Sequence, residues 1–300
     1  MGIYVISSRP ERGGAANKWS VMYSPNGNVP APPPLAPNYL PSSLVNSIVD
    51  PLVIAVHGYN NREQDVFTAY AGLAGLIHGN ESLTKYGFTG TVIGFDWPTG
   101  YLNVLDPNAQ MKLYASDLVQ ANTNGAPCFG LFLNRLTNAL TGKNIRVNVL
   151  SHSMGNFVVT RAFMDDPSVA SRITNFISFA PDILQSDVDL PQLQGCINNI
   201  AGKWQINWAQ ADIILMWASN WANILLGNEK CGADRLGQVG LRKDTAYGPK
   251  ITDHQCDEML SHVGATSFDA TRGLWRSSRR VHSAYWRCPE FMQSILDLLK

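Results

Sequence analysis

The sequence has no excess of charge of either sign. Lysine plus arginine number 23 and aspartate plus glutamate number 23, so the formal net charge at neutral pH is zero. Because proteins that bind nucleic acids or anionic membranes need a surplus of basic residues, this balance argues against both as the main partner. A local cluster of arginines, Arg276, Arg279 and Arg280, is interpreted as part of a solvated loop.

The sequence also lacks the cysteine spacing of a metal or redox site. It contains five cysteines and no C-x-x-C pair, which argues against a zinc ribbon and a thioredoxin-type site. We therefore expect no metal and no other cofactor. Four of the cysteines lie beyond residue 190, so one or two disulfides there would be compatible with an oxidising compartment.

No hydrophobic run is long enough to cross a bilayer. The most apolar segment, residues 213–226, is too short and is interrupted by Ser219, Asn220 and Asn223. The N-terminus has no basic segment followed by a long apolar run, so we expect no signal peptide, and the cytoplasm is the favoured compartment. The sequence indicates no particular oligomeric state.

Alternating strand and helix patterns occupy most of the chain. Three hundred residues, 45% hydrophobic and 15% charged, are typical of a single globular domain, residues 1–300. The alternation predicts an α/β fold in which helices cover both faces of a mostly parallel sheet, as a three-layer α/β/α sandwich. The predicted strands are 3–7, 52–56, 91–95, 146–150, 175–179 and 213–217, and the predicted helices are 63–78, 111–120, 131–140, 155–164 and 290–299.

Two further segments interrupt this alternation. The first 50 residues add a proline-rich connection, residues 29–41, to the N-terminal strand. Residues 227–271 are polar and rich in glycine, and they fit an insertion or a cap near the site.

One segment carries the residues expected around a nucleophile. The predicted strand 146–150 runs into Ser151-His152-Ser153-Met154-Gly155 and then into a helix. A serine on such a strand-to-helix turn presents its hydroxyl at the carboxyl edge of the sheet, and small residues two positions away let the backbone bend sharply. Gly155 meets this requirement, and Ser151, where glycine is commonest, is small enough to be accommodated. This context predicts the α/β-hydrolase fold with Ser153 as the nucleophile.

Two backbone amides are expected to stabilise the negative charge that develops on the substrate. In acyl transfer one such donor is the amide after the nucleophile, here that of Met154. The other comes from a loop after an earlier strand, and we predict Tyr59 for this oxyanion hole. His57, which precedes it, is expected to orient the loop by hydrogen bonds.

Six histidines are available as the general base. In this fold the base lies on a loop after the final strand and before the last helix, and His282 meets that condition. His254 and His262 remain as alternatives. His152 adjoins Ser153, and we expect its side chain to point away along the start of the helix.

Four segments of the chain form a specific set. They are VIAVHGYNN (53–61), VIGFDWPTG (92–100), VLSHSMGNFVVTRAF (149–163) and FAPDI (179–183), with weaker matches at DRLGQVG (234–240) and FDATRG…HSAYW (268–286). Together they resemble a bacterial group of α/β-hydrolases of unknown function. The resemblance implies a three-layer α/β/α sandwich and a serine–histidine–acid triad, without a particular substrate.

The acid of the triad is the point at which this sequence departs from that group. The relatives carry an Asn-Asp pair shortly after the strand predicted here at 213–217, whereas residues 218–223 contain no carboxylate. Asp182 is our prediction instead, because it follows the predicted strand 175–179 and lies between Ser153 and His282 in the chain, as this fold requires. The alternatives for orienting the imidazole are Asn220, Asn223, Asp187 and Asp189.

A serine, a histidine and an acid beside an oxyanion hole perform acyl transfer through a covalent acyl-enzyme. The expected activity is that of a carboxylic ester hydrolase. Trp97, Tyr101 and Trp221, near the predicted carboxyl ends of strands, are expected to bind an apolar or aromatic ester. The alternatives are a lipase or phospholipase at a lipid surface, with the Trp-rich stretch 204–226 as an interfacial element, and a non-catalytic binding protein that retains the fold.

Overall fold

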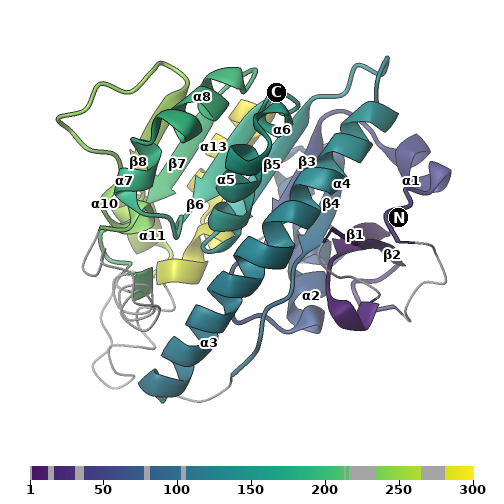
Figure 1. Ribbon diagram of the computed structural model, residues 1–300, viewed down its shortest axis with the longest axis horizontal. Coiled ribbons are helices and arrows are strands. Elements are labelled where there is room, and N and C mark those ends of the chain that lie inside the picture. Colours follow the sequence, from purple (N-terminus) through teal and green to yellow (C-terminus); the bar gives the residue numbers. More distant parts are fainter. Residues whose placement is uncertain are drawn as a thin grey trace.

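A central eight-stranded sheet organises the chain (Figure 1). The computed structural model describes residues 2–12, 17–30, 37–77, 82–102, 106–212, 214–215, 234–264 and 281–300. The strand order is β2-β1-β4-β3-β5-β6-β7-β8, and neighbouring strands pair in parallel except β1 with β2. The strands are β1 (Ile3–Ser7), β2 (Ser20–Ser24), β3 (Leu52–Val56), β4 (Thr91–Asp96), β5 (Val147–His152), β6 (Asn175–Phe179), β7 (Trp204–Trp208) and β8 (Ile251–Gln255).

Helices cover both faces of this sheet, so the predicted three-layer α/β/α sandwich is confirmed (Figure 1). One face carries α1 (Ser42–Ser47), α3 (Pro107–Gln120), α4 (Ala126–Ala139), α5 (Gly155–Asp165), α6 (Pro167–Ala170), α7 (Gln185–Val188), α8 (Pro191–Asn199) and α10 (Leu236–Val239). The other carries α2 (Glu63–Leu73), α11 (Asp257–His262) and α13 (Pro289–Leu299). A π-helical turn, Ala121–Gly125, joins α3 to α4, and short 3-10 helices lie at Pro10–Arg12, Leu83–Tyr86 and Tyr285–Arg287.

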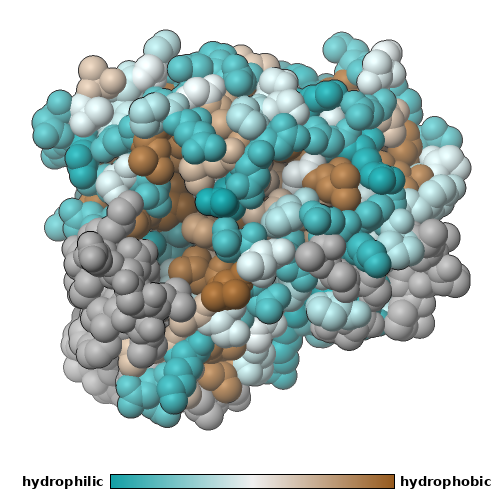
Figure 2. Space-filling model, in the orientation of Figure 1, coloured by the Kyte–Doolittle hydropathy of each residue, from teal (hydrophilic) through white to brown (hydrophobic). Residues whose placement is uncertain are grey.

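The continuous apolar runs of the sequence become strands that are buried on both sides. In β3, Leu52, Ile54 and Val56 pack in one core and Val53 and Ala55 in the other, because successive side chains of a strand point to opposite faces of the sheet. On the outer surface of the face that carries α3, α4 and α5, most residues are hydrophilic, and apolar residues reach the surface in small separate patches (Figure 2).

The predicted strand at 213–217 is wrong in position. Within it, Ile214 and Leu215 are helical and the other residues lie outside the described part. The strand after β6 is β7, Trp204–Trp208, which starts nine residues earlier. Its alternating Gln205 and Asn207 make it less apolar than the 213–217 run. Both amides are nevertheless buried, since the Gln205 amide donates to Asn207 and the Asn207 amide donates to the Ser178 carbonyl oxygen at 2.9 Å.

Two strands were not predicted from the sequence. β2 is a short antiparallel edge strand, and β8 forms the opposite edge. β8 lies inside the segment 227–271, so this part of the expected insertion or cap belongs to the main sheet.

The described cysteines, Cys128, Cys196, Cys256 and Cys288, are buried free thiols, and Cys231 lies outside the described residues. In the part of the chain that the structure describes, no helix combines the length and apolar character needed to cross a membrane.

A buried carboxylate on α3 holds two loops at the carboxyl edge of the sheet. Asp117 accepts a hydrogen bond from the Gly100 amide at 2.8 Å, in the loop after β4, and one from the Asn60 amide at 3.4 Å, in the loop after β3. Burial raises the pKa of Asp117 to about 6, although these two hydrogen bonds lower it in part.

Replacing Gly94 by alanine is expected to destabilise the protein by about 1–3 kcal/mol, as overpacking of a core usually does. A Cβ atom on Gly94, in β4, would overlap the ring of Tyr70 on α2, and that ring is fixed because its hydroxyl donates to the Phe95 carbonyl oxygen at 2.7 Å. The matched control is Gly195→Ala on α8, where a Cβ meets no atom within 4 Å. Denaturant unfolding should show the control to be neutral or stabilised by up to ~1 kcal/mol, and equal effects would contradict the expected overlap.

Replacing Asp117 by asparagine is expected to remove a pH-dependent loss of stability. Because its pKa is about 6, above the usual 3.8, the folded state holds this proton more tightly than the unfolded state. Ionisation of Asp117 therefore lowers the free energy of unfolding as the pH rises from about 4 to about 6. The loss is roughly 2–3 kcal/mol, because one unit of pKa difference corresponds to about 1.4 kcal/mol. In urea unfolding across this range, the stability of the wild type minus that of Asp117→Asn should fall with rising pH. A constant difference would show the carboxyl to have an ordinary pKa.

Candidate active site

Ser153 occupies a strained turn between β5 and α5. Its φ of 53° lies in the left-handed region that residues with a side chain rarely adopt. Gly155 makes the turn feasible, because a Cβ at this position would lie 2.5 Å from the His57 carbonyl oxygen. The Asn156 amide donates to the carbonyl oxygens of Ser151 and Ser153, at 3.2 and 3.0 Å, and so fixes the turn from within.

A chain of hydrogen bonds starts at the Ser153 hydroxyl. Ser153 Oγ lies 2.9 Å from His282 Nε2, and His282 Nδ1 lies 2.8 Å from Asp212 Oδ2. Because a carboxylate only accepts, Nδ1 carries the proton, so in the neutral imidazole Nε2 accepts from the serine. All three residues are buried, with exposures of 1% for Ser153, 6% for His282 and 0% for Asp212.

Asp212 is the residue that sequence reasoning missed. It lies four residues beyond the end of β7, at the carboxyl edge of the sheet. The turn that carries it is held by Asp257 on α11, whose carboxylate accepts from the amides of Gln210 and Ala211 at 2.9 and 3.0 Å. The alternating pattern of Trp204–Trp208 was the signal that could have identified the correct strand, and with it this aspartate.

Asp182, the predicted acid, has other partners. Its Oδ2 accepts a hydrogen bond from the Tyr114 hydroxyl, and its Oδ1 lies 3.6 Å from Arg235 Nη1. Burial raises the pKa of this carboxyl more than the Arg235 charge and the Tyr114 hydrogen bond lower it. The Asp182 amide donates to the Ser153 carbonyl oxygen at 3.2 Å. Asp182 therefore braces the back of the turn, and the carboxylate on His282 is that of Asp212.

The remaining candidates for the base and the acid lie elsewhere or cannot be placed. His254 is exposed on β8, and His262 pairs with Glu290 at 2.9 Å. Asp189 accepts from the Tyr247 hydroxyl at 2.9 Å, and Asp187 lies on the short helix α7. Asn220 and Asn223 lie outside the described residues.

His57 holds the loop after β3 through a buried ionic network. Its Nδ1 donates to the Gly58 carbonyl oxygen at 2.7 Å, and its Nε2 lies 3.1 Å from Asp96 Oδ1. Arg9 donates to the same carboxylate at 2.9 Å. Burial alone would raise the pKa of Asp96, but the His57 hydrogen bond and the Arg9 charge outweigh it and hold the pKa below its usual value. This arrangement matches the loop-orienting role expected for His57.

The two amides expected to form the oxyanion hole lie in segments that meet at Ser153. A Cβ on Gly58 would lie 2.7 Å from Ser153 Cβ and 3.3 Å from Ser153 Oγ, so a glycine is needed for this close approach, and Tyr59 follows it. Met154 opens α5, and within the described residues its amide has no hydrogen-bond acceptor. The Tyr59 ring packs edge-on against Tyr114, at 5.2 Å between centroids.

The three aromatic residues predicted to contact the substrate have different environments in the structure. Trp97 is fully buried, stacks on His57 and donates from its indole to the His57 carbonyl oxygen at 2.8 Å, so it belongs to the core. Tyr101 stands against Arg62, whose guanidinium lies 4.1 Å from the ring centroid. Trp221 lies outside the described residues. Trp204, expected in an interfacial element, is instead buried against Phe176.

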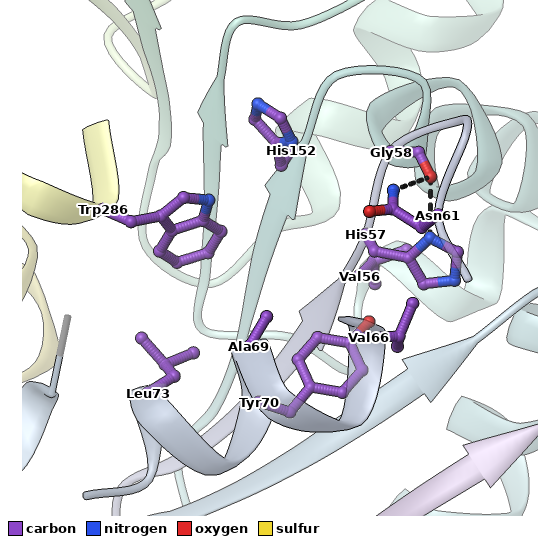
Figure 3. Close-up of a pocket in the computed structure, with 10 residues that line it drawn as sticks. All are labelled: Val56, His57, Gly58, Asn61, Val66, Ala69, Tyr70, Leu73, His152 and Trp286. Carbon is purple, nitrogen blue, oxygen red and sulfur yellow. Dashed lines mark hydrogen bonds between the residues drawn. The ribbon is translucent and has the colours of Figure 1, made fainter. Parts of the chain in front are cut away.

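An apolar pocket lies beside the turn (Figure 3). Figure 3 shows α2 along one side, the loop after β3 on another, and His152 and Trp286 opposite. Two polar side chains in its wall are bonded to backbone: the Asn61 side-chain amide donates to the carbonyl oxygens of Gly58 and Tyr59, and the Tyr70 hydroxyl donates to that of Phe95. The lining residues are Val56, His57, Gly58, Asn61, Val66, Ala69, Tyr70, Leu73, His152 and Trp286.

Several solved structures share distant similarity with the chain. Lipase B of Aspergillus fumigatus is 13% identical, with 83% of this chain and 61% of that chain covered and a TM-score of 0.40. Acetyl xylan esterase 1 of a Thermoanaerobacterium species is 13% identical, with 76% of this chain and 74% of that chain covered and a TM-score of 0.34. A metagenomic carboxyl esterase is 12% identical, with 83% of this chain and 75% of that chain covered and a TM-score of 0.36. The chain thus spans less than two thirds of the length of the lipase.

The comparison with protein families is more direct. No curated protein shows significant similarity to the chain. The family described as alpha/beta hydrolase of unknown function (DUF900) matches residues 37–269, which is more than half of the 300 residues and includes β3 to β8, Ser153 and Asp212. The chain therefore belongs to this family of alpha/beta hydrolases.

Proposed function

We propose that this chain is a carboxylic ester hydrolase with Ser153 as nucleophile, His282 as general base and Asp212 as the acid that orients the base. The observation that carries the proposal is the continuous hydrogen-bond chain from Ser153 Oγ through His282 to Asp212, with contacts of 2.9 and 2.8 Å. Serine, aspartate and histidine in this order along the chain are the set that this fold uses for acyl transfer.

In the proposed reaction, Ser153 Oγ attacks the ester carbonyl carbon while its proton passes to His282 Nε2. Asp212 stabilises the imidazolium through the proton that stays on Nδ1. Collapse of the tetrahedral intermediate breaks the bond to the alcohol, which leaves with the proton from Nε2, and an acyl-serine remains. Water then attacks the acyl-serine with His282 again as base, which releases the acid and restores the Ser153 hydroxyl.

The amides of Tyr59 and Met154 are assigned to the negatively charged oxygen of the tetrahedral intermediate. The close approach of Gly58 to Ser153 supports the first assignment, and the position of Met154 at the N-terminus of α5 supports the second. The strained φ of Ser153 supports a functional turn, because such strain persists where surrounding structure enforces it.

The apolar pocket favours an ester with an uncharged hydrocarbon group. Its walls are formed mainly by Val66, Leu73, Tyr70 and Trp286. They also include Gly58, which approaches Ser153 closely, and His152, which precedes Ser153. A charged substituent there would lose its hydration without a paired counter-charge in the described wall, which is costly. An acyl chain or a small aromatic group fits these walls.

Covalent labelling tests the nucleophile. A fluorophosphonate reacts with an activated serine, so the wild type should become labelled at Ser153 and Ser153→Ala should not, as read by mass spectrometry. Ser151→Ala, two residues away, is the control and should still be labelled. An unlabelled wild type would favour the non-catalytic binding protein instead.

The acid is tested by comparing two aspartates. Asp212→Asn should lower kcat on a p-nitrophenyl ester on the order of 10³- to 10⁴-fold, because the amide favours the wrong tautomer of His282. Asp182→Asn is the matched control and should stay within about tenfold of the wild type, since its carboxylate pairs with Tyr114 and Arg235. The reverse ranking would assign the role to Asp182.

The pocket is tested by narrowing it from α2. Ala69 lines the pocket and is exposed, so Ala69→Phe should reduce its room without disturbing the core. We expect kcat/KM to fall about tenfold or more for hexanoate esters and to change less than about threefold for acetate esters. Thr68→Phe, on the adjacent exposed position outside the pocket, is the control. An unchanged chain-length profile in Ala69→Phe would remove the pocket from substrate binding.

A further inference from the structure

His152, the residue before Ser153, contacts the segment that carries the proposed base. Its Nε2 lies 2.8 Å from the main-chain carbonyl oxygen of His282. A carbonyl oxygen only accepts, so His152 Nε2 carries the proton and donates it to this bond. The sequence led us to expect that this side chain points away along the start of α5. The contact with His282 shows that this expectation was wrong.

Aromatic residues from three elements fix the His152 ring. Its centroid lies 4.8 Å from that of His282, 5.7 Å from Phe179 at the end of β6 and 6.3 Å from Trp286. In Figure 3, His152 and Trp286 stand on the same side of the pocket. The donor is thus held on the rigid end of a central strand, which is where a supporting residue keeps its geometry best.

We infer that His152 is a positioning residue that anchors the backbone of His282 to the end of β5. The inference rests on the proposed function, in which His282 is the base. Asp212 holds the His282 ring through Nδ1, and His152 holds its main chain through the carbonyl oxygen. With both contacts in place, His282 Nε2 stays at hydrogen-bond distance from the hydroxyl of Ser153, the residue that follows His152.

The anchor also stays uncharged. Burial and, to a smaller extent, the neighbouring His282 together lower the pKa of His152 to about 3, against the effect of the hydrogen bond to the His282 backbone. A cation at this position, one ring away, would oppose the proton that His282 accepts during the reaction. A buried neutral imidazole supplies a fixed N–H donor without that repulsion.

The test separates the donor from the ring. His152→Gln retains an N–H donor at the same number of bonds from Cβ, whereas His152→Leu keeps bulk and loses the donor. We expect His152→Leu to lower kcat on an acetate ester and the rate of fluorophosphonate labelling on the order of 10- to 100-fold, since small misplacements of a catalytic group have effects of this size. KM for the acetate ester should stay nearly unchanged, because this substrate does not fill the pocket that His152 lines. His152→Gln should recover most of the loss. His262→Leu, which removes a surface histidine paired with Glu290, is the control and should behave as the wild type.

Each outcome has one meaning. Full activity in His152→Leu, or equal losses in His152→Leu and His152→Gln, would overturn the anchoring role. If His152→Leu does not fold, as judged by its melting temperature, His152→Phe takes its place, because a ring remains against Phe179 and Trp286. A wild type without labelling at Ser153 would reject the proposed function itself, which distinguishes that failure from the failure of the anchor.

Discussion

The left-handed backbone of Ser153 is the constraint on which the site depends. A φ of 53° is unfavourable for a serine, so neighbouring groups must hold it in place. The Ser153 amide donates to the Phe179 carbonyl oxygen at 3.1 Å, its carbonyl oxygen accepts from the Asn156 and Asp182 amides, and Gly155 leaves room for His57. β5, β6, α5 and the loop after β3 therefore all determine the position of one hydroxyl group.

Three buried carboxylates around this turn each hold a different set of neighbours in place. Asp212 faces His282, Asp182 faces Tyr114 and Arg235, and Asp96 faces Arg9 and His57. A buried carboxylate without a partner would be strongly destabilising, so each of these groups fixes the element that supplies its counter-charge or donor. The network around Asp96 thus shapes the loop with Tyr59, while the pair around Asp182 supports the back of the turn.

The two neighbouring histidines His152 and His282, whose ring centroids lie 4.8 Å apart, have different surroundings. His282 has a carboxylate on one nitrogen and a serine on the other, the arrangement that suits proton transfer. His152 has a backbone carbonyl oxygen and aromatic rings around it, so burial keeps it neutral. Residue type alone does not distinguish the two; the partner of each ring nitrogen does.

The sequence by itself determined the fold class and the central turn. The apolar runs of β3, β4 and β6 were predicted with little error, and the small residues around Ser153 required a strand-to-helix turn, because both signals are local and depend on neighbouring residues in the chain. His282 followed from its position before the last helix. These features needed no long-range information.

Only the tertiary structure decided which carboxylate contacts His282 and which acceptor His152 meets. Asp182 and Asp212 follow two neighbouring strands, β6 and β7, at the same edge of the sheet. The sequence pointed to Asp182, because β7 contains buried amides and its strand was predicted at the more apolar run 213–217 instead. The same holds for His152, whose partner lies 130 residues away. Both contacts depend on distances between segments that are far apart in the chain: the one between a carboxylate and the His282 ring, and the one between His152 Nε2 and its acceptor. Only the folded sheet sets those distances.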